Sequence, residues 1–374
     1  MTTFSVTPWD VKGEVDYDKL ITEFGTQRIS DELMARLQKY AKGELHVLLR
    51  RGLFFSHRDL NWVLDEYDKG NKFYLYTGRG PSGDTHIGHL VPWIMTKWLQ
   101  DVFDVPLYFQ LTDDEKFLFK DELSLEDTHR MAYENALDII ALGFDKKKTY
   151  LFTDTDYAKT LYPQALRVAK KITASTVKAA FGFTDTNNIG EYFYTSMQAV
   201  PAFLPSVQAG RNIPCLIPMG IDQDPHFRVS RDVMPKLGYY KPAALHCRFF
   251  PGLLGSMGKM SASQADAAIY TTDDEKTVEK KIRKYAFSGG KDTIEEHRKL
   301  GGNPAIDVSY QWLYMLFEPD DAKIKQIHDD YASGKLLSGE LKAILIEKLN
   351  AFLREHQKKR ESARKVVDKY FIKD

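Results

Sequence analysis

Residues 73–103 read FYLYTGRGPSGDTHIGHLVPWIMTKWLQDVF. The apolar run Phe73–Tyr76 predicts a short strand, and the Gly- and Pro-rich segment Thr77–Asp84 predicts a loop. A helical pattern follows from about Gly88 to Phe103, in which Pro92 is tolerated because it lies near the first turn. A strand, a glycine-rich loop and a helix in this order predict one βα unit of an α/β sheet.

The same alternation continues along the chain to about residue 272. Further short apolar strands are predicted at Leu107–Leu111, Tyr150–Phe152, Ile213–Met219 and Ala243–Phe250. Helical patterns lie between them, and one of these starts at Ser124, which forms a capping-box pattern with Asp127. Short strands that alternate with long helices predict a parallel sheet covered on both faces. We therefore expect an α/β, Rossmann-like doubly wound catalytic domain over residues 73–272.

The two flanking regions show few strand signals. Residues 1–72 lean towards helix, and we expect them to form an N-terminal extension that packs on the catalytic domain. Strand signals stop after residue 273, so residues 273–374 predict an all-helical C-terminal domain. The last part of this region is basic, with Lys348, Arg354, Lys358, Lys359, Arg360, Arg364 and Lys365.

Composition narrows the class of protein. The 374 residues carry 52 basic and 52 acidic side chains, so the net charge neither supports nor excludes a nucleic-acid partner. Cys215 and Cys247 follow no metal-ligand spacing and are too few for a disulfide framework. The N-terminus lacks the pattern of a signal peptide, and no apolar run reaches membrane-spanning length. We expect a cytoplasmic protein with no structural zinc and no membrane partner.

The tetrad His86-Ile87-Gly88-His89 lies where the glycine-rich loop meets the helix. Gly88 would let a flat ligand approach the backbone, because a side chain there would block it. His86 and His89 share a helical face and can both donate hydrogen bonds to phosphate oxygens, where the helix N-terminus adds positive potential. Such an arrangement would stabilise the negative charge of a pentavalent phosphorus transition state. Taken alone, two histidines at this place could also simply cap the helix.

A second motif follows some 170 residues later, in the loop GSMGKMSAS of residues 255–263. A mobile Lys259 could close on the β- and γ-phosphates of ATP and neutralise a pyrophosphate leaving group, with the serines adding hydrogen bonds. A lone lysine in a Gly/Ser loop is usually a surface residue. Its occurrence together with the histidine tetrad favours ATP activation, and the absence of a P-loop pattern argues against a kinase or an ordinary ATPase.

Three glutamines stand in apolar surroundings. Gln110 and Gln223 lie near the ends of predicted strands, where a glutamine is commonly just exposed to solvent. Gln198 lies on a hydrophobic helical stretch, and a buried amide there would need a partner.

Several longer segments of the chain carry a family resemblance. They include YTGRGPS before the histidines, TKWLQDVF after them, LTDDEKFLFK, FGFTD, the IDQDP segment at residues 221–225, GKMSAS and AFSGGKDTIEEHR. On these segments the chain resembles the tryptophanyl-tRNA synthetases of the eukaryotic and archaeal type, which are class I synthetases with HIGH and KMSKS signatures. The resemblance covers nearly the whole chain, and the segments together are far more specific than either signature alone.

The resemblance implies roles for particular residues. His86 and His89 would contact the ATP phosphates, and Lys259 would be the catalytic lysine of the mobile loop, carrying its charge alone because Ala262 replaces the second lysine of KMSKS. The segment Thr7-Pro8-Trp9 would fold over the active site. Further ATP-binding positions would be Arg79, Gly88, Gly220, Asp222, Met260, Ser261 and Ser263. The tryptophan pocket would be lined by Tyr76, Gln110, Glu115, Gln198 and Gln223, with Tyr76 and Gln110 nearest the indole nitrogen.

The resemblance also implies a two-step reaction. The tryptophan carboxylate would attack the α-phosphate of Mg-ATP to give tryptophanyl-adenylate and pyrophosphate, and a terminal ribose hydroxyl of tRNA(Trp) would then take the acyl group. ATP and Mg²⁺ are the implied cofactors, and Mg²⁺ would arrive with ATP, not in a site built from side chains. The family implies a homodimer and an anticodon-binding role for residues 273–374, with no DNA partner.

Three other interpretations stay open on the sequence. A tyrosyl-tRNA synthetase shares the fold and both motifs, although Asp224-Pro225 stands where tyrosine enzymes more typically have basic residues. A small-molecule nucleotidyltransferase can carry an HxGH pattern, but such chains generally lack GKMSAS and a long helical C-terminal domain. A catalytically silent, synthetase-like RNA-binding module would not require both histidines and Lys259.

Overall fold

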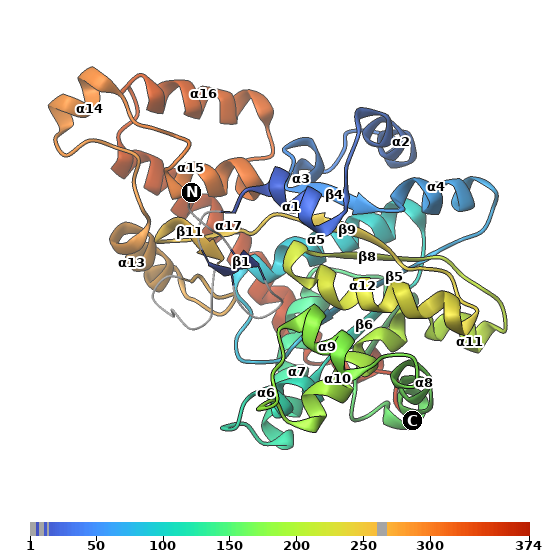
Figure 1. Ribbon diagram of the computed structural model, residues 1–374. Helices are drawn as coiled ribbons and strands as arrows, with labels where there is room; N and C mark the ends of the chain where they lie inside the picture. Colours follow the sequence, from blue (N-terminus) through green and yellow to red (C-terminus); the bar gives the residue numbers. More distant parts are fainter. Residues whose placement is uncertain (1–4, 7–10, 13–14, 260–267) are drawn as a thin grey trace.

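A central sheet organises the protein. The structure is a computed structural model that describes residues 5–6, 11–12, 15–259 and 268–374 (Figure 1). Among these residues, seven strands pair in the order β3-β4-β9-β8-β5-β6-β7. The five strands from β9 to β7 are mutually parallel, whereas β4 is antiparallel to β9 and β3 is antiparallel to β4. This arrangement confirms the predicted α/β fold with its parallel, doubly wound sheet.

The parallel strands are those that the apolar runs predicted, with shifted ends. They are β5 (Tyr74–Arg79), β6 (Leu107–Leu111), β7 (Thr149–Thr153), β8 (Cys215–Gly220) and β9 (Ala243–Cys247). Strand β5 continues past Tyr76 into the predicted loop, because Thr77, Gly78 and Arg79 pair with β6 as far as Leu111. Strand β9 stops at Cys247, three residues before the predicted end, where its pairing with β8 ends at Gly220.

The N-terminal region contributes to the same sheet. Strand β4 (Phe54–Arg58) pairs with β9, and the two-residue β3 (Gln27–Arg28) pairs with β4. The sequence analysis predicted helix and no strand in this region. The helices of this region are α1 (Tyr17–Phe24), α2 (Asp31–Ala41), α3 (Val47–Arg50) and α4 (Leu60–Asp68). Residues 1–72 therefore share a sheet with the predicted catalytic domain, and the boundary at 72 stays a prediction.

Helices cover both faces of the sheet. They are α5 (Ile87–Phe103), α6 (Asp113–Phe119), α7 (Leu125–Ala141), α8 (Ala158–Ala169), α9 (Ala174–Phe181), α10 (Ile189–Ala199), α11 (Leu204–Ala209) and α12 (Asp224–Val233). Helix α7 begins with the predicted capping box: the Ser124 hydroxyl accepts the Asp127 amide at 3.1 Å, and the Asp127 carboxylate accepts the Ser124 amide at 3.3 Å. Among the described residues, no helix is both long and apolar enough to cross a bilayer.

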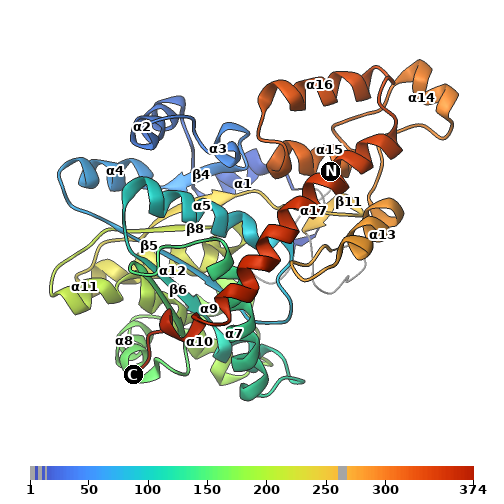
Figure 2. The ribbon, with the colours of Figure 1, turned by 180° about the vertical axis from the view of Figure 1, so that it is seen from behind.

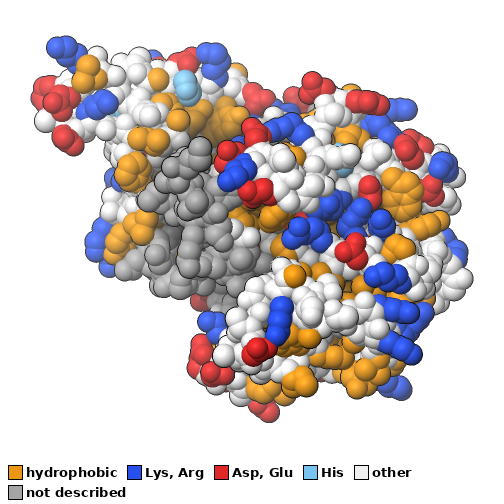
Figure 3. All heavy atoms as spheres, viewed as in Figure 1, with side chains coloured by type: hydrophobic (Ala, Val, Ile, Leu, Met, Phe, Trp, Pro, Cys, Tyr) orange, Lys and Arg blue, Asp and Glu red, His pale blue; other side chains and the backbone are white. Residues whose placement is uncertain are grey.

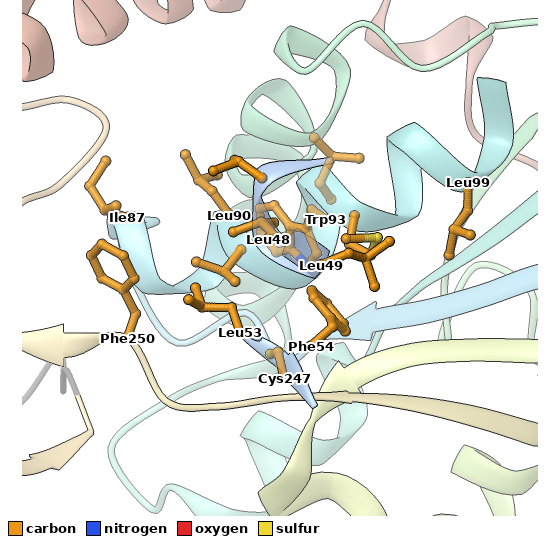
Figure 4. Packing of buried hydrophobic residues seen from close by; sticks show 14 of the residues in the cluster. Leu48, Leu49, Leu53, Phe54, Ile87, Leu90, Trp93, Leu99, Cys247 and Phe250 are labelled. Carbon is orange, nitrogen blue, oxygen red and sulfur yellow. The ribbon is translucent and has the colours of Figure 1, made fainter. Parts of the chain in front are cut away.

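The main core lies between α5, the N-terminal helices and the sheet. Trp93 of α5 lies close to Leu48 and Leu49 of α3, with Phe54 of β4 beside them (Figure 4). All of these side chains are buried, so α5 is held by the N-terminal region as well as by the sheet. This packing fixes the start of α5, which carries the histidine tetrad.

From residue 275 the described chain forms helices and turns, apart from a single bridge at Phe371. The helices are α13 (Glu275–Tyr285), α14 (Ile294–Leu300), α15 (Val308–Trp312), α16 (Asp321–Ala332) and α17 (Ser338–Ala363). Before them, β10 (Pro251–Gly252) and β11 (Gly255–Lys259) form a small antiparallel pair. Helix α17 leaves the helical lobe and runs back beside α7 (Figure 2). The predicted domain boundary near residue 272 stays a prediction, because α17 packs both against the other C-terminal helices and against α7 of the predicted catalytic domain.

Four of the basic side chains in the C-terminal stretch form ion pairs with acidic side chains of the same chain. Arg360 and Arg364 both bind Glu134 of α7, at 2.9 and 2.8 Å. Lys348 pairs with Glu318 at 2.6 Å, and Arg354 pairs with Glu275 at 2.6 Å. The remaining basic side chains, Lys358, Lys359 and Lys365, are exposed. On the face shown in Figure 3, acidic and basic side chains are mixed, in keeping with the zero net charge.

A buried ion cluster joins the N-terminal region to the rest of the sheet. Asp224, the first residue of α12, accepts hydrogen bonds from Arg58 Nε and Nη2 at 2.7 and 2.8 Å. His246 Nε2 lies 3.1 Å from the same carboxylate, and its Nδ1 lies 3.1 Å from the Ser56 hydroxyl. Burial by itself would raise the pKa of Asp224, but the hydrogen bonds from Arg58 and His246 outweigh it and hold this pKa well below its usual range.

Substitution of this carboxylate tests the cluster. We expect Asp224→Asn to lower the free energy of unfolding by about 3 kcal/mol at pH 7, because Arg58 is left without its buried partner. A depressed folded-state pKa stabilises the fold above the unfolded pKa of about 3.9, so the difference should persist at neutral pH and shrink as the pH falls below about 4. Denaturant titrations at several pH values measure this.

A matched control is Asp65→Asn, which removes one of the exposed carboxylates paired with Arg36. We expect it to change the free energy of unfolding by less than about 1 kcal/mol. Equal effects of the two substitutions on the free energy of unfolding would contradict the stabilising role of the buried cluster.

Candidate active site

A cavity of about 570 Å³ opens at the carboxyl ends of the central strands. Strands β5 and β8 pair only at Tyr74–Leu75 and then diverge. Pro218 of β8 has no amide hydrogen to continue this pairing, and its carbonyl accepts the Thr77 hydroxyl at 3.2 Å instead. The cavity lies between β5 and β8, where the strand order of the sheet reverses: the chain proceeds from β5 to β6 on one side and from β8 to β9 on the other. This is the usual ligand position in an open α/β sheet.

The predicted site residues that precede Lys259 all line this cavity. They are Tyr76, Arg79, His86, Gly88, His89, Gln110, Glu115, Gln198, Gly220, Asp222 and Gln223. Lys259 is the last residue of β11, and its side chain is not described. Met260, Ser261 and Ser263 lie outside the described residues, as does the segment Thr7-Pro8-Trp9.

Main-chain pairing brings the start of α5 next to residues 269–271, which follow the second motif in the chain. The Ile87 amide donates to the carbonyl of Ile269 at 3.0 Å, and the Thr271 amide donates to the carbonyl of Thr85 at 2.9 Å. The chain that leaves the second motif therefore returns to the start of α5, and His86 forms a bridge with Tyr270 there.

His86 and His89 both line the cavity from the first turn of α5. Their rings stack with centroids 3.4 Å apart, and the His86 amide donates to His89 Nδ1 at 3.2 Å. His89 therefore caps the helix, as the sequence allowed, and lines the cavity as well. The helix N-terminus lies at the same place and contributes positive potential.

Arg79 lies behind the histidines at the end of β5. Its Nη1 lies 2.7 Å from His89 Nε2, and its Nε donates to Asn135 at 3.2 Å. Burial lowers the pKa of Arg79 to about 10, against the opposing charges of Glu115 and Asp138, so the guanidinium stays charged at neutral pH. Its Nη2 is buried and has no hydrogen-bond partner within the described part of the chain. This nitrogen offers a charged donor to an anionic ligand.

A second set of polar groups forms the opposite part of the cavity. The hydroxyl of Tyr76 donates to Gln110 Oε1 at 2.5 Å and lies 3.0 Å from the carbonyl of Gln198. Gln110 is fully buried, so the solvent-exposed interpretation of this glutamine is wrong. Gln198 Oε1 is buried and has no partner among the described residues, which leaves an acceptor for a ligand.

Glu115 supplies negative charge to this part of the cavity. It accepts hydrogen bonds from Lys116 at 2.8 Å, from Thr112 at 2.6 Å and from Tyr194 at 3.3 Å. Burial would raise the pKa of Glu115, but the charge of Lys116 and the hydrogen bonds from Lys116 and Thr112 outweigh it, and the pKa is lowered. The side chain is therefore a carboxylate at neutral pH, suited to an ammonium group.

The end of β8 completes the wall. A Cβ atom on Gly220 would lie 2.4 Å from Asp222 Oδ1, so glycine is needed there for the Asp222 carboxylate to take its place. Gln223 Nε2 donates to Asp222 Oδ2 at 3.2 Å. Among the described residues, no cluster of three or more His, Cys, Asp or Glu side chains could hold a metal ion.

The sequence analysis did not single out some residues that line the cavity. Lys116 lies within the segment LTDDEKFLFK, Tyr194 lies one helical turn before Gln198, and His226 lies four residues after Asp222. Burial lowers the pKa of His226 to about 4, so this ring is neutral. Helical spacing from a suspected pocket residue would have indicated Tyr194. Nothing in the sequence marks His226 as buried.

Comparisons with known proteins show which family the chain belongs to. Residues 68–354 match the family model of class I tRNA synthetases for tryptophan and tyrosine. The chain is 58% identical to the tryptophan–tRNA ligase of Sulfurisphaera tokodaii and 56% identical to that of Sulfolobus acidocaldarius, over 98% of this chain and 94% of each relative. The crystal structure of Plasmodium falciparum tryptophanyl-tRNA synthetase superimposes with a TM-score of 0.90 at 43% identity, covering 96% of this chain and 98% of that one.

The chain therefore belongs to the class I tRNA synthetases of the tryptophan and tyrosine family. Within that family it lies with the tryptophanyl-tRNA synthetases, which are ligases, and this confirms the resemblance seen in the sequence. The comparisons favour this group over the tyrosyl enzymes and over small-molecule nucleotidyltransferases.

Proposed function

We propose that this protein joins L-tryptophan to tRNA(Trp) in two steps, both at the cavity beyond β5 and β8. The carboxylate of tryptophan attacks the α-phosphate of Mg-ATP, and pyrophosphate leaves. A terminal ribose hydroxyl of the tRNA then takes the tryptophanyl group from the adenylate. The observation that supports this proposal is the pairing of residues 85–87 with residues 269–271, since it returns the chain that follows the second motif to the start of α5, where the histidine tetrad lines the cavity.

The catalytic work falls to charge stabilisation and positioning, because no side chain needs to act as a covalent nucleophile. His86, His89 and Arg79 offer donors to the phosphates at the N-terminus of α5. Lys259, at the end of β11, adds positive charge as pyrophosphate departs. The further ATP positions are Gly88, Gly220 and Asp222 in the cavity and Met260, Ser261 and Ser263 after Lys259. Mg²⁺ enters with ATP as part of the substrate.

The tryptophan side of the cavity is rich in acceptors. Glu115 is a carboxylate, and Gln198 Oε1 is a buried acceptor with no partner in the described part of the chain, so the two suit the ammonium group of an amino acid. The hydroxyl hydrogen of Tyr76 is directed at Gln110 Oε1 and at the main-chain carbonyl of Gln198. The Tyr76 oxygen is therefore left to accept the indole N–H. Gln110 and Gln223 complete this set. A ring without an N–H would leave the Tyr76 oxygen without a donor.

The remaining partners follow from the proposed activity. We expect a homodimer in the cytoplasm, with no membrane or DNA partner. The helical region from 273 to 374 is the proposed site for tRNA, with Lys358, Lys359 and Lys365 as exposed basic side chains. Arg360 and Arg364 are engaged with Glu134 and contribute less than their charge suggests.

ATP–pyrophosphate exchange with the purified chain tests the proposal directly. We expect exchange that depends on tryptophan and is absent with tyrosine or phenylalanine. Exchange with tyrosine would keep the ATP site and overturn the assignment of the amino-acid pocket. No exchange with any of the three amino acids would favour the alternative that the chain is a catalytically silent RNA-binding module.

The role of Lys259 can be separated from substrate binding. We expect Lys259→Ala to slow tryptophan-dependent exchange by about 10²-fold or more, because the charge on departing pyrophosphate loses its counter-charge. Tryptophan affinity, measured by calorimetry, should be unchanged. Lys291→Ala, which removes an exposed loop lysine, is the control and should exchange at the wild-type rate. An unchanged rate in Lys259→Ala would disprove the assignment.

The role of Gln110 shows in selectivity. We expect Gln110→Ala to reduce the ratio of kcat/KM for tryptophan over phenylalanine by about tenfold or more, because the Tyr76 hydroxyl loses the acceptor that orients it. The control is Gln208→Ala, at an exposed glutamine of α11 outside the cavity. If selectivity in Gln110→Ala equals that of the wild type, the indole acceptor lies elsewhere.

A further inference from the structure

A buried carboxyl group lies directly behind the tryptophan side of the cavity. Asp154 follows the last residue of β7 and is buried. It is not among the described residues that line the cavity. Its two oxygens accept hydrogen bonds from Gln110 Nε2 at 2.8 and 3.0 Å. The sheet produces this contact, because Gln110 pairs with Phe152 in the parallel ladder and Asp154 lies two residues further on the same side of β7.

We infer that Asp154 is a positioning residue for indole recognition, and this rests on the proposed function. Asp154 binds the amide nitrogen of Gln110, and so turns the amide oxygen of Gln110 towards the Tyr76 hydroxyl. Tyr76 is then surrounded by two acceptors, Gln110 Oε1 and the carbonyl of Gln198, and must donate. Its oxygen is left with a free lone pair on the cavity side. At Tyr76 the cavity therefore presents a hydrogen-bond acceptor and no donor, which favours a ligand ring that carries an N–H group.

The opposite orientation of Gln110 would change what this wall offers. An amide nitrogen directed at Tyr76 would donate to the tyrosine oxygen and occupy a lone pair that the indole needs. The amide alone has no preference between the two orientations, because each of its ends can hydrogen-bond. The acceptor at Asp154 is what separates them.

The surroundings of Asp154 keep it an acceptor towards Gln110. Burial, together with the charge of Asp114 and a hydrogen bond to it, raises the pKa of Asp154 well above its usual range, and burial raises the pKa of Asp114 to about 7. A protonated carboxyl still has one oxygen that accepts, and both oxygens of Asp154 lie within hydrogen-bond distance of Gln110 Nε2, so Asp154 can accept from this amide whether or not it carries a proton.

The test compares L-tryptophan with β-(3-benzothienyl)-L-alanine, in which sulfur replaces the indole N–H in a ring of nearly the same shape. The measured quantity is the ratio of their kcat/KM values in ATP–pyrophosphate exchange. In Asp154→Asn the amide can accept or donate, so Gln110 is no longer held in one orientation. We expect the ratio to fall by about tenfold or more, through loss with tryptophan and little change with the analogue.

Two further variants make the result specific. Asp156→Asn removes a carboxylate two residues along, which contacts Tyr133 and Lys373 but not Gln110, and should leave the ratio at the wild-type value. The double variant Asp154→Asn with Gln110→Glu exchanges the carboxyl and the amide. The amide introduced at position 154 then donates to the carboxylate introduced at position 110, and that carboxylate accepts from the Tyr76 hydroxyl. We expect this exchange to restore the ratio.

The outcomes separate the inference from the proposed function. A folded Asp154→Asn with the wild-type ratio would overturn the role of Asp154 and leave the proposed function intact. If the single variant does not fold, the double variant decides: a wild-type ratio supports the inference, and a reduced one overturns it. A wild-type protein that gives no exchange with tryptophan would overturn both. A purely structural role for Asp154 would lower the rates for both amino acids equally and leave the ratio unmoved.

Discussion

The divergence of β5 and β8 is the constraint on which the rest of the site depends. The two strands pair for only two residues, and beyond Leu75 the pairing gives way to a side-chain contact, the bond from the Thr77 hydroxyl to the Pro218 carbonyl. Tyr76 of β5 and Ile217, Met219 and Gly220 of β8 line the cavity from this point on. Every other part of the site is arranged around this gap. Helix α5 enters from one side of it, α10 and α12 close the other, and the segment that returns from β11 pairs with the start of α5.

The cavity has two parts of opposite chemical character. Near α5 the lining consists of donors, with a buried guanidinium nitrogen and a helix N-terminus. Near α6 and α10 the lining includes two strong acceptors, the Glu115 carboxylate and a buried amide oxygen of Gln198. Under the proposed function, an amino acid bound between them would present its ammonium group to the part near α6 and α10 and its carboxylate to the other, beside the phosphates. The polarity of the lining would then orient the reacting carboxylate without any group that bonds to it covalently.

The sequence predicted the parallel strands and most of the described site, because both leave local signals. Short apolar runs marked β5 to β9, and the two phosphate motifs marked the ends of the strands that bear them. Strand β4 left a weaker signal, since more than half of it is Ser-His-Arg. Two of these polar residues bind partners from distant parts of the chain: Arg58 binds Asp224, and Ser56 binds His246. Asp154 left none. Within Thr153-Asp154-Thr155-Asp156 it is one of two similar carboxylates, and only the register of β7 against β6 directs it to Gln110.

Residues 370–372 bond to the outer edge of β7. Strand β7 is the last strand of the sheet, and an unpaired strand edge invites pairing with another molecule. The terminal residues cover it: the Leu151 amide donates to the carbonyl of Tyr370 at 3.0 Å, and the Ile372 amide donates to the carbonyl of Leu151 at 2.8 Å. Phe371 stacks on Tyr133 with ring centroids 4.2 Å apart and holds this cover in place. Removal of residues 370–374 would uncover an aggregation-prone edge, visible as concentration-dependent association, in a protein whose catalytic groups are all intact.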